Sequence, residues 1–266
     1  MKMKFIFVRV ITCIAALSFY LCFLLACTNP ANMASEHIKQ GDVYFQQGNF
    51  DLAISEYTRA GELDPSIDVK AKVNQANEKK VGLLLQAGDY DKSIEAGISA
   101  LAAAPEDDNL KEKLADAYIA RAWYYKAKRL NPYTLDDLYK AVKIAPKYYR
   151  AHFELGRFHN NQWQFSIGIL DLNKALSLKP DFAAAYSERA FSYYKNQKYD
   201  AGLADANKAI ELDATDAQFY YNRSLIYRGM ERNEPAVSDL ETTLKLSKDT
   251  ALTDKAGADL QALKPY

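Results

Sequence analysis

The sequence is poor in cysteine, and its few cysteines are confined to one end. Cys13, Cys22 and Cys27 are the only three among 266 residues, so residues 28–266 contain none. This excludes an intramolecular disulfide or a site with several thiolate ligands from that part of the chain. Net charge is absent too, because 34 Lys and Arg balance 34 Asp and Glu. Without a global excess of basic residues, we expect no nucleic-acid partner.

Motifs of the common enzyme classes are also missing. The sequence has no Walker-type loop and no GxSxG, GxGxxG or HExxH motif. His152 and His159 share a helical face, but no acidic third ligand stands beside them, so packing is favoured over metal binding. The pair Asp136-Asp137 falls in the first turn of an expected helix, where carboxylates interact favourably with the helix dipole. We therefore expect no catalytic residue, no cofactor and no metal.

The N-terminus has the layout of a secretory signal. Lys2, Lys4 and Arg9 precede the stretch 10–26, which contains no charged residue. Its 17 residues are near the short limit for a membrane span, so an uncleaved anchor remains an alternative.

The stretch ends in Leu24-Leu25-Ala26-Cys27, which resembles the lipobox of bacterial lipoproteins. The resemblance implies that residues 1–26 are a signal peptide and that Cys27 becomes the lipidated N-terminus. Residues 27–33 would then be the lipidated cysteine and a short linker, at most about 25 Å long. Thr28 stands where Asp favours inner-membrane retention in enterobacterial lipoproteins. The resemblance therefore implies the periplasmic face of a bacterial envelope, with the outer membrane favoured over the inner. Cleavage would remove three basic residues, and 31 minus 34 leaves a net charge of −3.

The rest of the chain is periodic. The segment 47–54 (QGNFDLAI) recurs as 87–94 (AGDYDKSI) and as 196–203 (NQKYDAGL), and prolines close alanine-bearing apolar segments at Pro65, Pro105, Pro146 and Pro180. With these features the chain resembles the tetratricopeptide repeat, a helix–turn–helix of 34 residues. Setting the closing proline at repeat position 32 gives units near 34–67, 74–107, 115–148, 149–182, 183–216 and 217–248.

Small residues recur where the two helices of a unit would cross. Repeat position 20 reads Ala53, Ser93, Thr134, Gly168, Gly202 and Ala236. Small side chains let helices approach closely. We predict an all-α fold, a right-handed α-α superhelix of about six units over 34–248. A capping helix is expected over 249–266, because Leu252, Ala256, Leu260 and Leu263 form an apolar stripe and a solenoid cannot leave its end bare.

In tetratricopeptide arrays the first helices line a concave groove, and repeat positions 2, 5, 9, 12 and 13 face it. By that resemblance the first two units are neutral to acidic there, whereas the third to sixth units carry cations and aromatic rings, with Asp116 the only acid. The predicted groove residues are Trp123, Lys126, Arg150, Phe153, Arg157, Asn160, Asn161, Phe191, Tyr194, Lys195, Tyr221 and Arg228. Such a set suits an acidic or C-terminal peptide. The alternative is that the cations keep the face soluble and the rings pack between helices.

The resemblance implies a non-enzymatic scaffold, membrane-bound through a lipid anchor. Relatives of this layout include pilotin-like assembly factors and adaptors for murein hydrolases, and the sequence does not separate them. The different alternative is a periplasmic carrier that encloses a small ligand for a transporter. A closed apolar tunnel would favour the carrier, and an open groove with exposed cations would favour a peptide. The partner's identity and the oligomeric state do not follow from the sequence.

Overall fold

The structure is a computed structural model that describes residues 29–263, so the predicted signal peptide and Cys27 lie outside the described residues. This part of the chain contains thirteen helices and no strand. The helices are α2 (Pro30–Gln46), α3 (Phe50–Leu63), α4 (Lys70–Gln86), α5 (Tyr90–Ala103), α6 (Asp108–Ala127), α7 (Asn131–Ile144), α8 (Tyr149–Asn161), α9 (Phe165–Leu178), α10 (Ala183–Lys195), α11 (Tyr199–Leu212), α12 (Ala217–Gly229), α13 (Asn233–Leu246) and α14 (Thr250–Leu263). Within residues 29–263, no helix is both long and apolar enough to cross a membrane.

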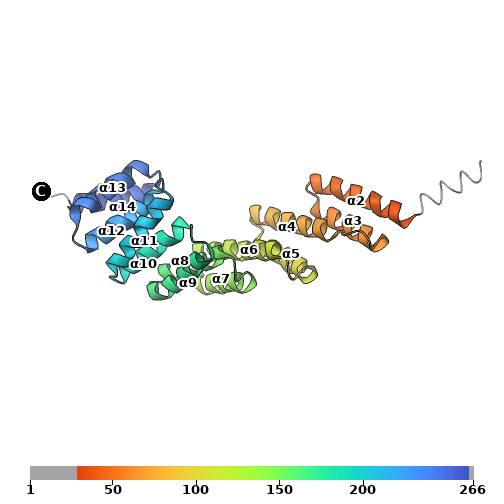
Figure 1. The fold of residues 1–266 in the computed structure, drawn as a ribbon, viewed down its shortest axis with the longest axis horizontal. Coiled ribbons are helices and arrows are strands. Elements are labelled where there is room, and N and C mark those ends of the chain that lie inside the picture. Colours follow the sequence, from red (N-terminus) through yellow and green to blue (C-terminus); the bar gives the residue numbers. More distant parts are fainter. Residues whose placement is uncertain (1–28, 264–266) are drawn as a thin grey trace, which may run out of the picture. The chain divides into compact units, whose positions relative to one another are not determined.

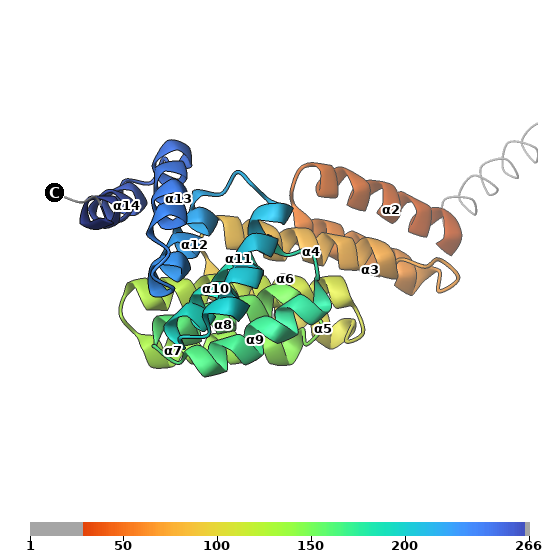
Figure 2. The ribbon, with the colours of Figure 1, turned by 60° about the vertical axis from the view of Figure 1, so that its left-hand side comes forward.

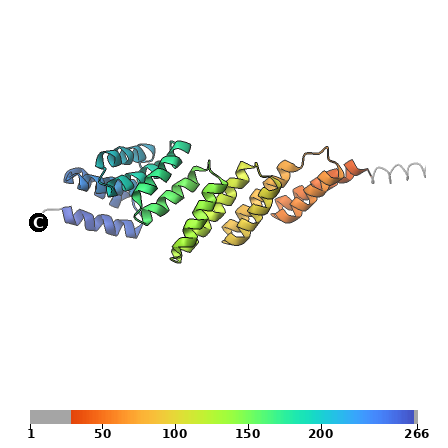
Figure 3. The ribbon, with the colours of Figure 1, turned by 90° about the horizontal axis from the view of Figure 1, so that it is seen from below.

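The helices form six hairpins followed by the single helix α14 (Figure 1). The expectation of an all-α fold with six helical hairpins and a final helix is confirmed for residues 29–263. The first helices of the second and third hairpins, α4 and α6, have 17 and 20 residues, against 13 in α8, α10 and α12. Figure 3 shows α2 and α3 as an antiparallel pair.

The predicted linker is shorter than expected, because four of its residues, 30–33, are helical. Asn29 caps α2 by accepting a 3.0 Å hydrogen bond from the backbone N–H of Ala31. Pro30 then occupies the first turn, where its missing N–H costs nothing. These two helix-start signals outweigh the polar composition on which the linker was predicted.

Every hairpin turns through one residue in the left-handed conformation, always at repeat position 15. Glycine fills it in the first two hairpins, with φ of 77°. The other four use non-glycine residues with φ between 58° and 63°, namely Arg129, Trp163, Gln197 and Glu231. Non-glycine residues seldom adopt this conformation, at a cost of about 1–2 kcal/mol. The geometry of the hairpin therefore requires this backbone conformation at position 15, whereas the identity of the residue there varies.

The chain divides into two compact units between Leu114 and Ala115, at the start of the third predicted repeat. The first unit contains α2 to α5 and the beginning of α6. At its first crossing, the ring of Tyr57 from α3 lies over Gly41 of α2, where any Cβ would collide with it. The Tyr57 hydroxyl donates a 2.7 Å hydrogen bond to Asp42, so the ring is fixed as well as buried.

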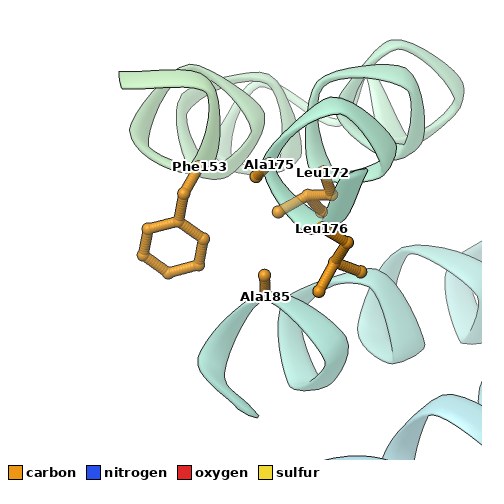
Figure 4. Close-up of a cluster of buried hydrophobic side chains, with 5 residues drawn as sticks. All are labelled: Phe153, Leu172, Ala175, Leu176 and Ala185. Carbon is orange, nitrogen blue, oxygen red and sulfur yellow. The ribbon is translucent and has the colours of Figure 1, made fainter. Parts of the chain in front are cut away.

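In the second unit, α8 and α9 cross at two glycines. A Cβ on Gly168 would stand 3.1 Å from the backbone oxygen of Gly156, which requires small residues at this crossing. An apolar cluster is shared by α8, α9 and α10, as Figure 4 shows. Its members are Phe153, Leu172, Ala175, Leu176 and Ala185. At the C-terminal end, α14 lies beside α13 (Figure 2), and its apolar stripe packs there as predicted.

In three hairpins of the second unit, an arginine on the first helix pairs with an aspartate on the second helix. Arg223 of α12 donates two 2.8 Å hydrogen bonds to Asp239 of α13, and a third to Asn207 of the preceding hairpin. Arg189 repeats this arrangement between α10 and α11, and Arg121 makes the bidentate pair between α6 and α7. Each guanidinium also lies between two tyrosine rings, at 5.5–5.9 Å from the centroids.

The hairpin of α8 and α9 breaks this pattern. Leu155 stands in place of the arginine, and His152 and His159 replace the flanking tyrosines. Asp171 is kept, and His159 meets it through Nδ1 at 2.7 Å. Burial raises the pKa of Asp171, and the hydrogen bond from His159 opposes that shift. His152 instead contacts the carbonyl oxygen of Pro146 at 3.0 Å. The two histidines therefore have separate partners, and no cluster of three potential metal ligands occurs among residues 29–263.

Candidate functional site

All twelve predicted groove residues lie in the second unit, on four first helices. Trp123 and Lys126 are on α6, and Tyr221 and Arg228 are on α12; the other eight are on α8 and α10. Contacts between side chains show that α6 packs beside α8, and α8 beside α10. The helices thus bring together residues that are a full repeat apart in sequence.

Arg157, at the middle of the predicted groove, is neutralised within the protein. Its Nη1 lies 3.0 Å from Glu154 and its Nε lies 3.7 Å from Glu188. The guanidinium also stacks on Trp123, whose indole N–H donates a 3.0 Å hydrogen bond to Glu154. Burial raises the pKa of Glu188, and Arg157 opposes that rise. Arg157 therefore holds three neighbouring helices together rather than presenting an unpaired charge.

The other two arginines also have carboxylate partners. Arg150 pairs with Asp116 at 3.1 Å. Arg228 pairs with Asp259 of α14, which also accepts a 3.0 Å hydrogen bond from Tyr221. The groove region thus contains more acidic residues than were predicted from the repeat positions. Glu154, Glu188 and Asp259 were missed because the first two lie one place away from the groove-facing positions and the third belongs to the capping helix.

Two of the predicted groove residues are buried instead of facing solvent. Phe153 is 7% exposed and belongs to the apolar cluster of Figure 4. Asn160 is 6% exposed; it donates to Glu188 and accepts a 2.8 Å hydrogen bond from Ser192. Phe153 therefore packs between helices, as in the alternative interpretation for the rings, whereas the burial of Asn160 was not expected. Asn161, the next residue, is exposed.

Lys126 has no carboxylate partner among the described residues. Its ammonium lies 5.9 Å from the ring centroid of Trp123 and 5.5 Å from that of Phe158. Partial burial lowers the pKa of Lys126, and the nearby charge of Arg157 lowers it further. The Lys126 ammonium thus packs against two aromatic rings and is repelled by the positive charge of Arg157. A bound anion would reduce this repulsion.

Lys195 is the second such cation on a first helix within residues 29–263; Lys128 over Tyr124 and Lys179 over Tyr149 lie on rings in the same way outside the first helices. Its ammonium lies 5.3–5.4 Å from the centroids of Phe191, Tyr194 and Trp163, and no carboxylate pairs with it. The rings continue beyond it, because Phe165 contacts both Trp163 and Phe191. Trp163 and Phe165 were not predicted, since they lie in and after the turn rather than on a first helix. The signal available was a tryptophan at a turn position that glycine fills in the first two hairpins and Arg129, Gln197 and Glu231 fill in the other three.

Two pockets lie in the first unit, away from these residues. The smaller, of about 210 Å³, is lined by Phe50, Leu83, Leu84 and the ion pair of Lys80 with Asp51, among others. The larger, of about 400 Å³, is lined mainly by polar and charged side chains such as Asn74, Glu78 and Asp107. Both are open to solvent.

Two segments of the chain match family models described as tetratricopeptide repeat, over residues 38–108 and 217–250. No curated protein is similar to the chain in sequence.

Several solved structures share the fold. YrrB, described as a tetratricopeptide repeat protein with an unusual peptide-binding site, is 19% identical with a TM-score of 0.52, over 76% of this chain and 97% of its own. A tetratricopeptide repeat protein from Parabacteroides merdae is 17% identical with a TM-score of 0.52, over 87% and 86%. A chain of the APC/C hetero-tetramer Cut9–Hcn1 is 18% identical with a TM-score of 0.55, over 93% of this chain and 46% of its own. At these identities the likeness concerns the fold alone.

Proposed function

We propose that the protein is a lipid-anchored scaffold of the bacterial cell envelope, which binds a peptide segment of a partner protein. The tetratricopeptide repeat fold supports this proposal, because it is a fold suited to protein–protein interaction. The binding surface is the face of the second unit formed by α6, α8, α10 and α12. A pilotin-like assembly factor or an adaptor for murein hydrolases are the two roles that fit this layout.

One observation carries the proposal. Lys126 and Lys195 are lysines on first helices, and each has its ammonium on aromatic rings without a carboxylate partner in the described chain. A lysine on aromatic rings presents a cation and an apolar surface side by side, and Trp and Tyr are enriched at binding hot spots. The comparable positions of the first two repeats offer no such pair of features.

The lipid anchor is proposed from the sequence motif at Cys27. If that residue carries the lipid, α2 begins only three residues later, at Pro30. Three extended residues span at most about 11 Å, so the first repeat would stand close to the membrane surface. We place the protein on the periplasmic face, with the outer membrane favoured because Thr28 follows the cysteine.

The carrier alternative receives no support from the pockets of the first unit. A closed apolar cavity would be needed to hold a small ligand away from water. The larger of these pockets is polar, the smaller has a volume of about 210 Å³, and both open to solvent.

Capture of a partner from detergent-solubilised membranes tests the scaffold. Lys126→Glu with Lys195→Glu should remove the specific partner, because each substitution places a carboxylate where the partner's anion would bind. Lys198→Glu is the matched control, since this exposed lysine lies in the next turn and contacts none of the rings. Arg157 is unsuitable for this test, because its replacement would leave Glu154 and Glu188 unpaired. Equal capture by all three proteins would contradict the proposed surface.

The anchor is tested separately by Cys27→Ser. We expect this variant to accumulate as an unprocessed precursor without lipid, because serine lacks the thiol that forms the thioether. Intact-mass spectrometry of the membrane fraction gives the readout. A Cys27→Ser protein that is processed and anchored as the native chain is would refute the lipoprotein proposal and leave the scaffold untouched.

A further inference from the structure

Exposed apolar side chains of the second unit gather on two neighbouring hairpins. Within the described part of this unit, every large apolar side chain that is exposed belongs to the α6–α7 or the α8–α9 hairpin: Tyr124, Leu130, Tyr133, Tyr139, Trp163, Ile167 and Leu170. Trp163, Leu170 and Tyr133 protrude most, with exposed fractions of 74%, 67% and 60%. Single exposed apolar residues are ordinary, whereas a group of them marks a surface that meets something else.

The turns of these two hairpins lie at the same edge of the unit. Trp123 of α6 reaches Glu154 of α8, where its indole N–H donates a hydrogen bond. About one helical turn further along α6, Lys126 reaches Phe158, which lies about one turn further along α8. The two helices therefore run side by side in the same direction, and the turns that follow them are neighbours.

This turn edge, defined as residues 128–133 and 163–170, carries positive charge and no acid. Neither segment contains Asp or Glu. Lys128 and Arg129 are exposed, and neither pairs with a carboxylate of the described chain. The turn edge therefore presents two cations beside protruding apolar and aromatic side chains.

The other hairpins lack this combination. The turns of the first two hairpins contain Asp51, Asp89 and Asp91, and that of the sixth contains Glu231 and Glu234. In the fifth hairpin no large apolar side chain is exposed. The combination is therefore a property of two neighbouring hairpins and not of the repeat.

We propose that the turn edge lies on the membrane surface, with its rings among the lipid headgroups and Lys128 and Arg129 against anionic lipid. Tyr and Trp suit this layer because one end of each ring system is apolar and the other polar. Lys and Arg suit it because their stems lie on apolar surface while their charges stay in the polar layer. A protein partner would hold its hot-spot residues in well-packed pockets, whereas Tyr133 and Trp163 project outward from turns.

The proposal takes from the proposed function only that the chain is anchored in a membrane. Its cations, Lys128 and Arg129, are not the lysines proposed to bind the peptide. Contact with the membrane and capture of a protein partner can therefore be tested by different variants.

Fluorescence of Trp163 in the full chain tests the contact. Trp123→Phe leaves Trp163 as the only tryptophan, and Phe191 already occupies the repeat position of Trp123 in the fifth unit. The purified protein is combined with phosphatidylcholine vesicles that either lack or contain about one third phosphatidylglycerol, an anionic lipid. Bromine on the acyl chains of these lipids quenches a tryptophan that contacts them. Flotation with the vesicles reports the anchor, whereas quenching reports the turn edge.

We expect the anionic vesicles to shift the Trp163 emission to shorter wavelength and to quench it about twofold more than vesicles of phosphatidylcholine alone. Salt at about 0.5 M should reverse both effects, because it screens the attraction between Lys128 or Arg129 and the lipid. Each basic residue near an anionic surface contributes about fivefold to the binding constant, so loss of both should weaken the contact about 25-fold.

The variant Lys128→Gln with Arg129→Glu removes these charges. Gln162 and Glu231 occupy the same turn positions in other hairpins, so we expect the fold to be kept and the difference in quenching to disappear. Lys147→Glu is the matched control, because this exposed lysine lies in the turn before α8, at the opposite end of that helix. It should leave the quenching of Trp163 unchanged.

Equal quenching of Trp163 in the two kinds of vesicle would overturn the proposal, as would quenching that the double variant retains. Loss of quenching in Lys147→Glu would also overturn it, since the contact would then depend on overall charge. If the double variant keeps its quenching but loses a protein captured from detergent-solubilised membranes, the turn edge is a protein-binding surface instead. Flotation and quenching with anionic vesicles only would support the turn edge and remove the anchor of the proposed function.

Discussion

The pair of Arg223 and Asp239 offers a sharp test of how the hairpins of the second unit hold together. Two 2.8 Å hydrogen bonds join the guanidinium to the carboxylate, whose side chain is only 5% exposed. We predict that Arg223→Leu lowers the free energy of unfolding by about 3 kcal/mol, because it leaves a buried carboxylate without a partner. The leucine itself is tolerated at this position, since Leu155 occupies it in the α8–α9 hairpin.

Urea denaturation followed by circular dichroism measures the loss, and a double-mutant cycle assigns it. Asp239→Asn removes the charge, so the double variant Arg223→Leu with Asp239→Asn should be more stable than Arg223→Leu alone. Since repeats contact mainly their neighbours, hydrogen exchange should speed up in α12 to α14 and remain unchanged in α2 and α3.

A loss below about 1 kcal/mol for Arg223→Leu would refute the reasoning, because it would mean that water reaches Asp239 and solvates it. A double variant no more stable than the single one would also refute it, since the damage would then come from lost packing against Tyr220 and Tyr227 rather than from the unpaired charge.

Two further predictions concern packing and pH. Gly168→Ala should cost about 1–3 kcal/mol in urea denaturation, because its Cβ collides with the buried side chain of Asn160, whereas Gly257→Ala, with open space around it, should cost nothing. Burial and the neighbouring Asp259 raise the pKa of Tyr221 to about 12, above its ordinary 10. Its contribution to stability is therefore complete below pH 10 and lost as the pH rises through 12. Stability measured from pH 9 to 12 should fall more steeply for the native protein than for Tyr221→Phe, and parallel curves would contradict this.

The sequence by itself determined the fold. Small residues at recurring positions permit close helix crossings, and the closing prolines mark where each repeat ends, so the count of six hairpins and a final helix follows from the repeat pattern alone. Local signals also determine helix ends. The start of α2 at Pro30 was nevertheless missed, because the polar composition of that stretch obscures the cap that Asn29 provides.

The tertiary structure decided which predicted groove residues are available. Repeat position indicates the face on which a side chain lies, but apart from Glu154, which precedes Arg157 by three residues on the same helix, the carboxylate partners of these arginines come from other helices. Arg157 meets Glu188 and Arg228 meets Asp259 only because α10 and α14 pack alongside, so neutralised arginines could not be told apart from the unpaired Lys126 and Lys195 by sequence. Charge is compensated through space within a few ångströms, whereas sequence spacing reports only contacts within one helix.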